Sequence, residues 1–178
     1  MQVKIPEKMK KFLNAGRGNF KVAKVGEFGY NTSSCYASAA ARQQTVPTAE
    51  AEREEQAMED HERSFMLAVF LDGELVGNCG INTMSDHFKM RHRASLGISI
   101  KKKAWGLGIG TLLMEKALEQ AKENGFTQVE LGVFADNDRA RHLYRKLGFT
   151  EMGCIPKAFC LKDGTYRDEV QMVKFLTD

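Results

Sequence analysis

The sequence predicts an α/β fold built on one mixed β-sheet. Asp72-Gly73 and Asp163-Gly164 each separate two apolar runs, which is the pattern of antiparallel hairpins. Between these hairpins, Gly110–Ala121 carries apolar residues at helical spacing and lies between two alternating strand segments. A strand, a helix and a second strand in that order imply parallel pairing of the two strands. The sheet is therefore expected to contain both parallel and antiparallel pairs.

The N-terminal part of the chain predicts an extension, a strand and a helix. Residues 1–18 are Lys-rich and end in a glycine-containing loop signature, so we expect an N-terminal extension in which Lys8–Leu13 forms a short helix. Asn19–Val25 alternates as the first strand. A threonine suited to an N-cap precedes Ala49–Glu62, which is predicted to be a charged helix with a solvated glutamate face.

The middle of the chain is predicted to contain three strands. Phe65–Leu71 and Glu74–Ile81 form the first hairpin, because the Asp-Gly pair between them favours a tight turn. Asn82–Arg93 is polar and is expected to be a loop. Ala94–Ile100 follows as the third strand and leads into the central helix.

The last third of the chain alternates strand and helix before a final hairpin. The central helix ends at an Asn-Gly pair, and Val129–Val133 alternates as a strand. Asp136–Asp138 is a suitable cap for a second helix. The apolar stripe of that helix consists of Ala140, Leu143, Tyr144 and Leu147. Phe149–Leu161 and Thr165–Leu176 then form the terminal hairpin.

Composition excludes several classes of protein. The 178 residues are 43% hydrophobic and 28% charged, which is typical of a globular domain and not of a disordered chain. A net charge of +3 gives no argument for a nucleic-acid partner. The apolar runs are shorter than the ~20 residues that span a bilayer, and Met1–Lys11 lacks a secretory signal, so we expect a cytoplasmic protein without a membrane partner. The four Cys and four His show no metal-ligand spacing, so no metal is expected.

A glycine-rich turn, Trp105–Thr111, opens the central helix. Its alternate glycines allow the backbone to approach a bulky anion without obstruction by Cβ atoms. The first N–H groups of the helix point at the same place, and the helix dipole favours negative charge there. Lys101–Lys103 lie just upstream and add positive charge. We interpret the turn as a phosphate-binding site.

The glycine spacing excludes a Walker A loop and weakens the case for a dinucleotide-binding loop. A Walker A loop requires Gly-Lys-Ser/Thr, which is absent. A dinucleotide fingerprint requires a third glycine where this chain has Thr111 or Leu113. Glu130 lies about 20 residues further on, as that fingerprint requires, but in mid-strand. A nucleotide-dependent oxidoreductase is therefore kept only as an alternative.

The stretch from about Ala94 to Phe149 resembles the GNAT N-acetyltransferase superfamily. The family pattern Gln/Arg-x-x-Gly-x-Gly/Ala is matched by Trp105–Gly110, with Trp105 in place of Gln or Arg. The pattern Asn-x-x-Ala-x-x-x-Tyr-x-x-x-Gly-Phe is matched by Asn137–Phe149. The segment Gly153–Met172 is also similar to small-amine and amino-acid acetyltransferases.

The resemblance implies a GNAT-like fold. One mixed, mostly antiparallel sheet of six to seven strands is then expected, with a central parallel strand–helix–strand unit and about four helices. Residues 19–178 would form a single acetyltransferase domain.

The resemblance also implies a coenzyme site. Acetyl-CoA is the expected cosubstrate, with its pyrophosphate on the backbone of the glycine-rich turn and its pantetheine arm along the preceding strand. Asn137 would bind the pantetheine, and Tyr144 would face the sulfur. The implied cofactor-binding residues are Ile98, Ser99, Ile100, Gly106, Leu107, Gly108, Ile109, Gly110, Thr111, Asn137 and Tyr144.

Acyl transfer from a thioester to an amine requires a polarised carbonyl, a neutral amine and a proton for the departing thiolate. A backbone N–H on Ala94–Ile100 is placed to polarise the carbonyl. Tyr144 is the expected catalytic acid, because a phenol stays protonated at neutral pH and still donates. Periodicity alone would make Tyr144 a core aromatic and Asn137 a helix cap.

The general base is not identified by the sequence. Many relatives carry a glutamate on the strand before the glycine turn, but Ala94–Ile100 has none. The candidates are Glu130, Asp86, His87 and His92, with a water chain as the alternative, and none of them is nominated.

We therefore expect an acetyl-CoA-dependent N-acetyltransferase in which a primary amine attacks directly in a ternary complex. The acceptor is expected to be a small amine or amino acid, and a peptide or protein amine is the second choice. Its pocket would be shaped by Thr32–Arg63 and Ile155–Tyr166. The alternative is a non-catalytic acyl-CoA-binding or sensing domain of the same fold. A homodimer is the usual expectation for relatives.

Overall fold

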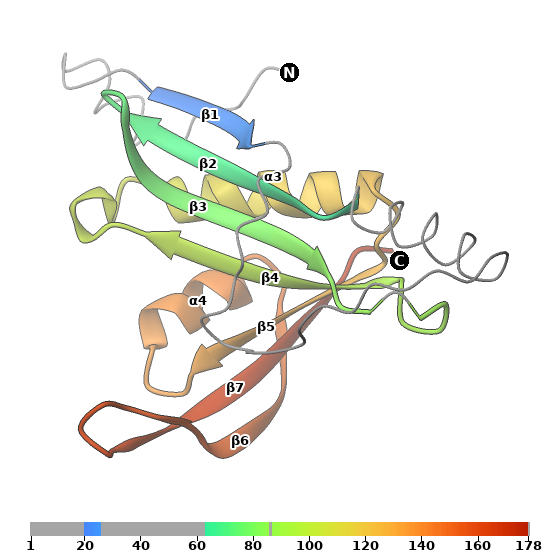
Figure 1. Ribbon diagram of the computed structural model, residues 1–178, viewed down its shortest axis with the longest axis vertical. Coiled ribbons are helices and arrows are strands. Elements are labelled where there is room, and N and C mark those ends of the chain that lie inside the picture. Colours follow the sequence, from blue (N-terminus) through green and yellow to red (C-terminus); the bar gives the residue numbers. More distant parts are fainter. Residues whose placement is uncertain (1–19, 26–62, 86, 178) are drawn as a thin grey trace, which may run out of the picture.

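The computed structural model describes residues 20–25, 63–85 and 87–177, which form one seven-stranded sheet with helices packed against it (Figure 1). The strands are β1 (Phe20–Val25), β2 (Phe65–Leu71), β3 (Glu74–Thr83), β4 (Arg93–Ile100), β5 (Gln128–Phe134), β6 (Thr150–Cys160) and β7 (Tyr166–Phe175). The helices are the 3-10 turn η1 (Lys102–Ala104) and the α-helices α3 (Ile109–Glu123) and α4 (Asp138–Lys146). The helices expected over Lys8–Leu13 and Ala49–Glu62 lie outside the described residues.

The order of the strands confirms the predicted mixed sheet. It runs β1-β2-β3-β4-β5-β7-β6. Only β4 and β5 pair in parallel, and every other neighbouring pair is antiparallel. The helix α3 connects the parallel pair, so the strand–helix–strand unit is where the period of the sequence placed it.

The turn residues behave as their chemistry predicts. Asp72 and Gly73 both have positive φ values, of 53° and 78°, as a two-residue hairpin turn requires. Gly164 has φ 81° in the terminal hairpin. The largest boundary difference from the prediction lies in the segment expected to be a loop, because β3 continues two residues into it, to Thr83, and Arg93 at its other end is the first residue of β4. Other strand ends differ from the prediction by one residue.

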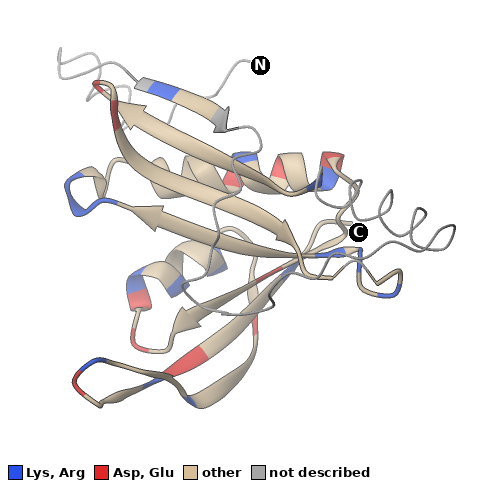
Figure 2. Ribbon diagram, viewed as in Figure 1, with Lys and Arg blue, Asp and Glu red and all other residues tan. Residues whose placement is uncertain are grey.

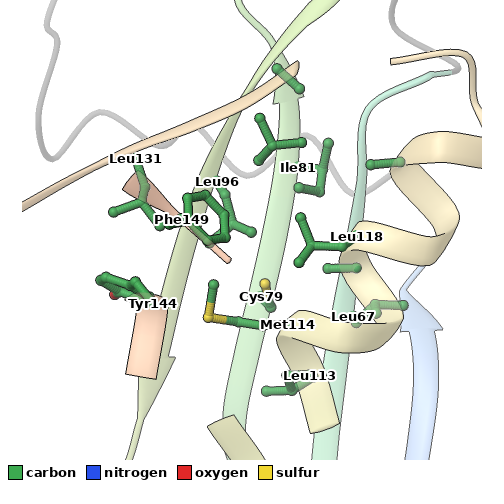
Figure 3. Close-up of a cluster of buried hydrophobic side chains, with 14 of the residues drawn as sticks. Leu67, Cys79, Ile81, Leu96, Leu113, Met114, Leu118, Leu131, Tyr144 and Phe149 are labelled. Carbon is green, nitrogen blue, oxygen red and sulfur yellow. The ribbon is translucent and has the colours of Figure 1, made fainter. Parts of the chain in front are cut away.

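The core lies between one face of the sheet and the two α-helices (Figure 3). On α3, Leu113, Met114, Ala117 and Ala121 are fully buried, which confirms the apolar stripe read from the sequence. They pack with inward side chains of the strands, with Tyr144 of α4 and with Phe149, which precedes β6. Burial of each large side chain contributes about 1.5–3 kcal/mol. The cluster therefore fixes both helices on the same face of the sheet.

The parallel strands β4 and β5 separate after only three paired residues. Their register covers Arg93 to Ser95 on β4 and Gln128 to Glu130 on β5. Beyond these residues, β4 stays paired with β3 as far as Ile100, and β5 stays paired with β7 as far as Phe134. We call the facing, unpaired edges of residues 96–100 and 131–134 the β4–β5 split. Figure 1 shows the two strands diverging toward their carboxyl ends, where α3 and α4 begin.

An ion pair joins the two strands at the closed end of the split. Arg93 donates from Nε to Glu130 Oε1 at 2.5 Å and from Nη2 to Glu130 Oε2 at 2.8 Å. The Gln128 amide donates to the same carboxylate at 2.8 Å. The Arg93 guanidinium thus holds the pKa of the Glu130 carboxyl below its ordinary value. A bidentate ion pair of this kind fixes both the distance between the two side chains and their relative orientation.

We predict that Glu130→Gln lowers stability at neutral pH but not in acid. A lowered carboxyl pKa means that the stabilisation is complete above the unfolded-state pKa of about 4.3 and is lost as pH falls through the folded-state value. Loss of about 1 kcal/mol would lower Tm by about 2–4 °C at pH 7. Thermal unfolding followed by circular dichroism at pH 7 and pH 3.5 measures the difference.

The matched control is Glu119→Gln, which removes an exposed carboxylate paired only with Lys116 on the surface of α3. Its Tm should change by about 1 °C or less, because exposed ion pairs contribute little. A Tm difference between Glu130→Gln and wild type that is the same at both pH values would contradict the role of the ion pair.

Candidate functional site

The glycine-rich turn leaves the first N–H groups of α3 without partners in the described part of the chain. Gly108 is the N-cap residue, with φ 84°, and no side chain caps the helix. Leu112 is the first residue whose N–H bonds back, to Gly108 O at 3.0 Å, and no backbone bond is made by the N–H groups of residues 109–111. Such groups suit an anion, since the helix dipole adds to their positive charge.

The three glycines have different roles. Gly106 and Gly108 have left-handed φ values of 78° and 84°. Gly110 instead allows close packing, because a Cβ atom there would lie 3.0 Å from Leu143 Cδ2 and 3.2 Å from Ile100 Cδ1. The third glycine therefore lets the start of α3 contact both α4 and the end of β4.

Trp105, the residue that departs from the family pattern, connects the two sides of the split. Its indole N–H donates to Ile100 O at 2.8 Å. The guanidinium of Arg139, in the first turn of α4, stacks over the indole ring at 4.2 Å. Cation–π contacts of this type contribute about 0.5–1 kcal/mol at exposed sites. Where the family pattern has a polar side chain, Trp105 therefore makes contacts that connect β4, the glycine-rich turn and α4.

The lysines before the turn are partly neutralised. Lys101 donates to Glu74 at 2.9 Å, and Lys103 also bonds to that carboxylate. Figure 2 shows the basic residues grouped between the end of β4 and the start of α3. Their contribution to an anion site is therefore smaller than the count of three lysines implies.

The edge of β4 directs alternate backbone groups into the split. Lys101 N–H bonds to Val76 O of β3 at 2.9 Å, so in this register Ser99 also directs its backbone groups toward β3, opposite Asn78. The groups of Ile98 and the N–H of Ile100 consequently point toward β5, where no described strand pairs with them. Of the three predicted edge residues, Ile98 and Ile100 thus offer an N–H to a ligand.

Asn137 is the N-cap residue of α4, which is one of the two roles expected for it, the other being to bind the pantetheine arm. Its side-chain Oδ1 accepts from Ala140 N–H at 3.2 Å. The side-chain amide donor is not used in this contact and lies on an exposed residue at the open end of the split.

Tyr144 lies inside the core with an unpaired hydroxyl. The residue is 7% exposed, and its ring lies 6.1 Å from that of Phe149 (Figure 3). Burial, with a smaller effect from Cys79, raises the pKa of Tyr144 to about 12. Among the described residues, nothing hydrogen-bonds to this hydroxyl. A buried donor without a partner costs about 1–3 kcal/mol, which is the usual mark of a group held for a ligand.

The structure separates the candidate bases from the split. The Glu130 carboxylate is engaged by Arg93 at the closed end. His87 and His92 lie on the loop before β4, about 20 Å or more from Ile100 along an eight-residue strand. Asp86 lies outside the described residues. Of the described candidates, Glu130 is thus held in an ion pair, and the two histidines precede the first paired residue of β4.

A carboxylate that the sequence analysis did not single out lies at the split. Glu169 of β7 is the register partner of Phe134 and lies over Gly132, where a Cβ atom would collide with its carboxylate. The alternation of side chains along β7 predicts the face of the sheet on which Glu169 lies. The position of Glu169 over Gly132 depends on the register between β7 and β5, which are distant in the sequence.

None of the three described cysteines offers an exposed thiol at the split. Cys79 is fully buried on β3, and burial raises the pKa of its thiol to about 12. Cys154 and Cys160 are exposed on β6, and Cys35 lies outside the described residues. Within residues 20–25, 63–85 and 87–177, no three metal-ligating side chains come together. No helix in that part of the chain is long and apolar enough to span a membrane.

Comparison with known proteins gives the family. The model of the acetyltransferase (GNAT) family matches residues 32–149. L-amino acid N-acetyltransferase AaaT of Escherichia coli (strain K12) is 30% identical over 110 residues, which cover 61% of this chain and 66% of that protein. The chain thus spans slightly less than two thirds of this relative's length.

Solved structures agree with this result. The acetyltransferase of the GNAT family from Streptococcus pneumoniae superposes with a TM-score of 0.61 at 32% identity, over 71% of this chain and 74% of that chain. The structure of yncA from Salmonella typhimurium with its cofactor acetyl-CoA gives a TM-score of 0.65 at 18% identity, over 89% and 95% of the two chains, and shows the likeness of fold. The family match covers well over half of the residues and includes both the glycine-rich turn and α4, so this chain belongs to the acetyltransferase (GNAT) family.

Proposed function

We propose that this protein is an acetyl-CoA-dependent N-acetyltransferase that acetylates a primary amine by direct attack in a ternary complex. The observation that supports it most strongly is the β4–β5 split, which places an unpaired strand edge beside the uncapped start of α3 and the buried Tyr144. A nucleotide-dependent oxidoreductase would not need a sheet opened between two parallel strands.

The residues of the split fit the parts of acetyl-CoA. The N–H groups of residues 109–111 suit the pyrophosphate. The pantetheine arm has amide groups that can pair with Ile98 and Ile100 as an added strand would. Asn137 has a side-chain amide donor left for the same arm. We propose that these residues, with the rest of the glycine-rich turn, bind the coenzyme.

The chemistry follows from two donors. A backbone N–H on the edge of β4 polarises the thioester carbonyl as the amine adds. The Tyr144 hydroxyl gives its proton to the departing sulfur. Direct attack is favoured over an acetyl-cysteine intermediate by the positions of the described cysteines. Cys79 is fully buried, which raises the pKa of its thiol, and Cys154 and Cys160 lie on β6, which β7 separates from β5.

For the acceptor we propose a small amine or an amino acid. The Escherichia coli relative is an L-amino acid N-acetyltransferase, which supports this class. A peptide or protein amine is the second choice. A thiol-release screen against amino acids, polyamines and short peptides tests the choice directly.

Acetyl-CoA should stabilise the folded protein, and NADP⁺ should not. Ligand at about 100 times its Kd adds about 2.7 kcal/mol to the free energy of unfolding. For a chain of this length the corresponding rise in Tm is about 5–10 °C. A thermal shift assay with each ligand measures the difference. An equal shift with NADP⁺ would favour the oxidoreductase, and binding without thiol release from a broad amine panel would favour a sensor.

Tyr144→Phe should lower kcat by about ten-fold or more and leave acetyl-CoA affinity nearly unchanged, and it should raise Tm slightly because it removes a buried hydroxyl without a partner in the described residues. No hydrogen bond within the described residues is lost, so the variant removes only the proton donor. Because the pKa of Tyr144 is raised to about 12, the wild-type hydroxyl stays protonated and active up to at least pH 10. Steady-state kinetics with calorimetric titration of acetyl-CoA gives all three quantities.

Phe149→Leu is the control for disturbed packing, since it changes the ring next to Tyr144 but keeps the hydroxyl. It should lower Tm and change kcat by about three-fold or less. A Tyr144→Phe variant with the wild-type kcat would remove Tyr144 as the acid.

A further inference from the structure

Glu169 faces the side of the sheet opposite to the two α-helices. On β5, Leu131 and Val133 point into the core, so Gly132 and Phe134 face the other side. The register pairs Gly132 with Gln171 and Phe134 with Glu169. These four residues therefore share the face of the sheet away from α3 and α4.

The Glu169 carboxylate occupies the space that a side chain at position 132 would take. A Cβ atom on Gly132 would overlap Glu169 Oε1 and lie 2.7 Å from its carboxyl carbon. The Gln171 amide donates to Glu169 Oε2 at 2.6 Å. One carboxylate oxygen is thus held by a neutral amide, and the other lies above the bare backbone of β5 inside the split.

The phenol and the carboxylate stand on opposite faces of the same opening. Tyr144 approaches the split from the core side, among the residues that pack on α3 (Figure 3). Glu169 approaches it from the other face, over residue 132 in the unpaired stretch of β5. A thioester that lies along the β4 edge would have a proton donor on one side and a proton acceptor on the other.

The surroundings of Glu169 suit an amine. Phe134, which is 36% exposed, meets Phe159 edge to face at 4.8 Å and forms an aromatic wall beside the carboxylate. The other charged groups on this face of β5 and β7 are already paired. Glu130 is bound by Arg93, and Arg167, whose guanidinium lies 6.0 Å from the centre of the Phe134 ring, pairs with Asp136. A carboxylate next to aromatic faces favours a cation such as an ammonium group.

We infer that Glu169 is the general base, which accepts a proton from the acceptor amine as that amine attacks the thioester; the inference rests on the proposed function. The nitrogen lone pair forms the N–C bond, the C–S bond breaks, and its electron pair stays on sulfur. Glu169 takes the proton that leaves nitrogen, and Tyr144 gives its own proton to the thiolate. Solvent then returns a proton from Glu169 to the phenolate, so the net reaction moves one proton from nitrogen to sulfur.

The test compares Glu169→Gln with wild type in thiol release at several pH values. We expect kcat/KM at pH 7 to fall by about 100-fold, within the range of general-base effects. The deficit should shrink as pH rises, because hydroxide from the solvent can then accept the nitrogen proton in place of the missing carboxylate. Affinity for acetyl-CoA, measured by calorimetry, should stay within about two-fold of wild type.

Two further variants keep the result interpretable. Glu115→Gln removes an exposed carboxylate from the outer face of α3 and should leave all values unchanged. Gly132→Ala keeps the Glu169 charge but displaces the carboxylate, and it should lower kcat without lowering Tm, because the end of a flexible side chain can move aside.

The outcomes separate the two proposals. Wild-type protein that binds no acetyl-CoA would end the proposed function itself. Wild-type turnover with an equally active Glu169→Gln or Gly132→Ala variant would overturn the role of Glu169 alone. A Glu169→Gln variant with a raised KM, an unchanged kcat and the wild-type pH profile would also overturn it, because that pattern indicates binding of the amine without proton transfer.

Discussion

The early end of pairing between β4 and β5 is the constraint on which the rest of the structure depends. Two parallel strands that remained paired would bury their edges against each other. Here β4 has five residues, and β5 four, with no described strand paired on the facing side. Backbone polar groups left in that state need hydrogen bonds from water or from a ligand. The sheet therefore contains an internal edge that suits an extended, amide-bearing molecule.

Both ends of this edge are fixed by side chains. The Arg93–Glu130 pair joins the strands where they still touch, and Trp105 with Arg139 joins them again through the glycine-rich turn and α4. Between these contacts, the core face supplies a phenol and the other face a carboxylate. The two groups that we propose transfer protons come from different elements, α4 and β7, so neither element needs to carry both.

The sequence predicted the parts of the fold that depend on neighbouring residues. The Asp-Gly pairs predict the hairpins, helical spacing predicts α3 and α4, and alternate glycines predict the tight turn before α3. The sequence could not predict the β4–β5 split, because the split depends on the register between two strands whose paired residues are 35 positions apart. For the same reason the sequence placed His87 and His92 among the base candidates and passed over Glu169, whose position depends on the pairing of β5 with β7.

The contact between Trp105 and Arg139 has a consequence for ligand entry. It bridges the two sides of the opening through contacts between protein groups alone. A cosubstrate that enters such a preorganised slot loses its own freedom but does not have to order the protein around it. Because the contact lies at the glycine-rich turn, it should affect the affinity for the pyrophosphate end of a coenzyme more than the choice of acyl group, which we propose lies near Tyr144.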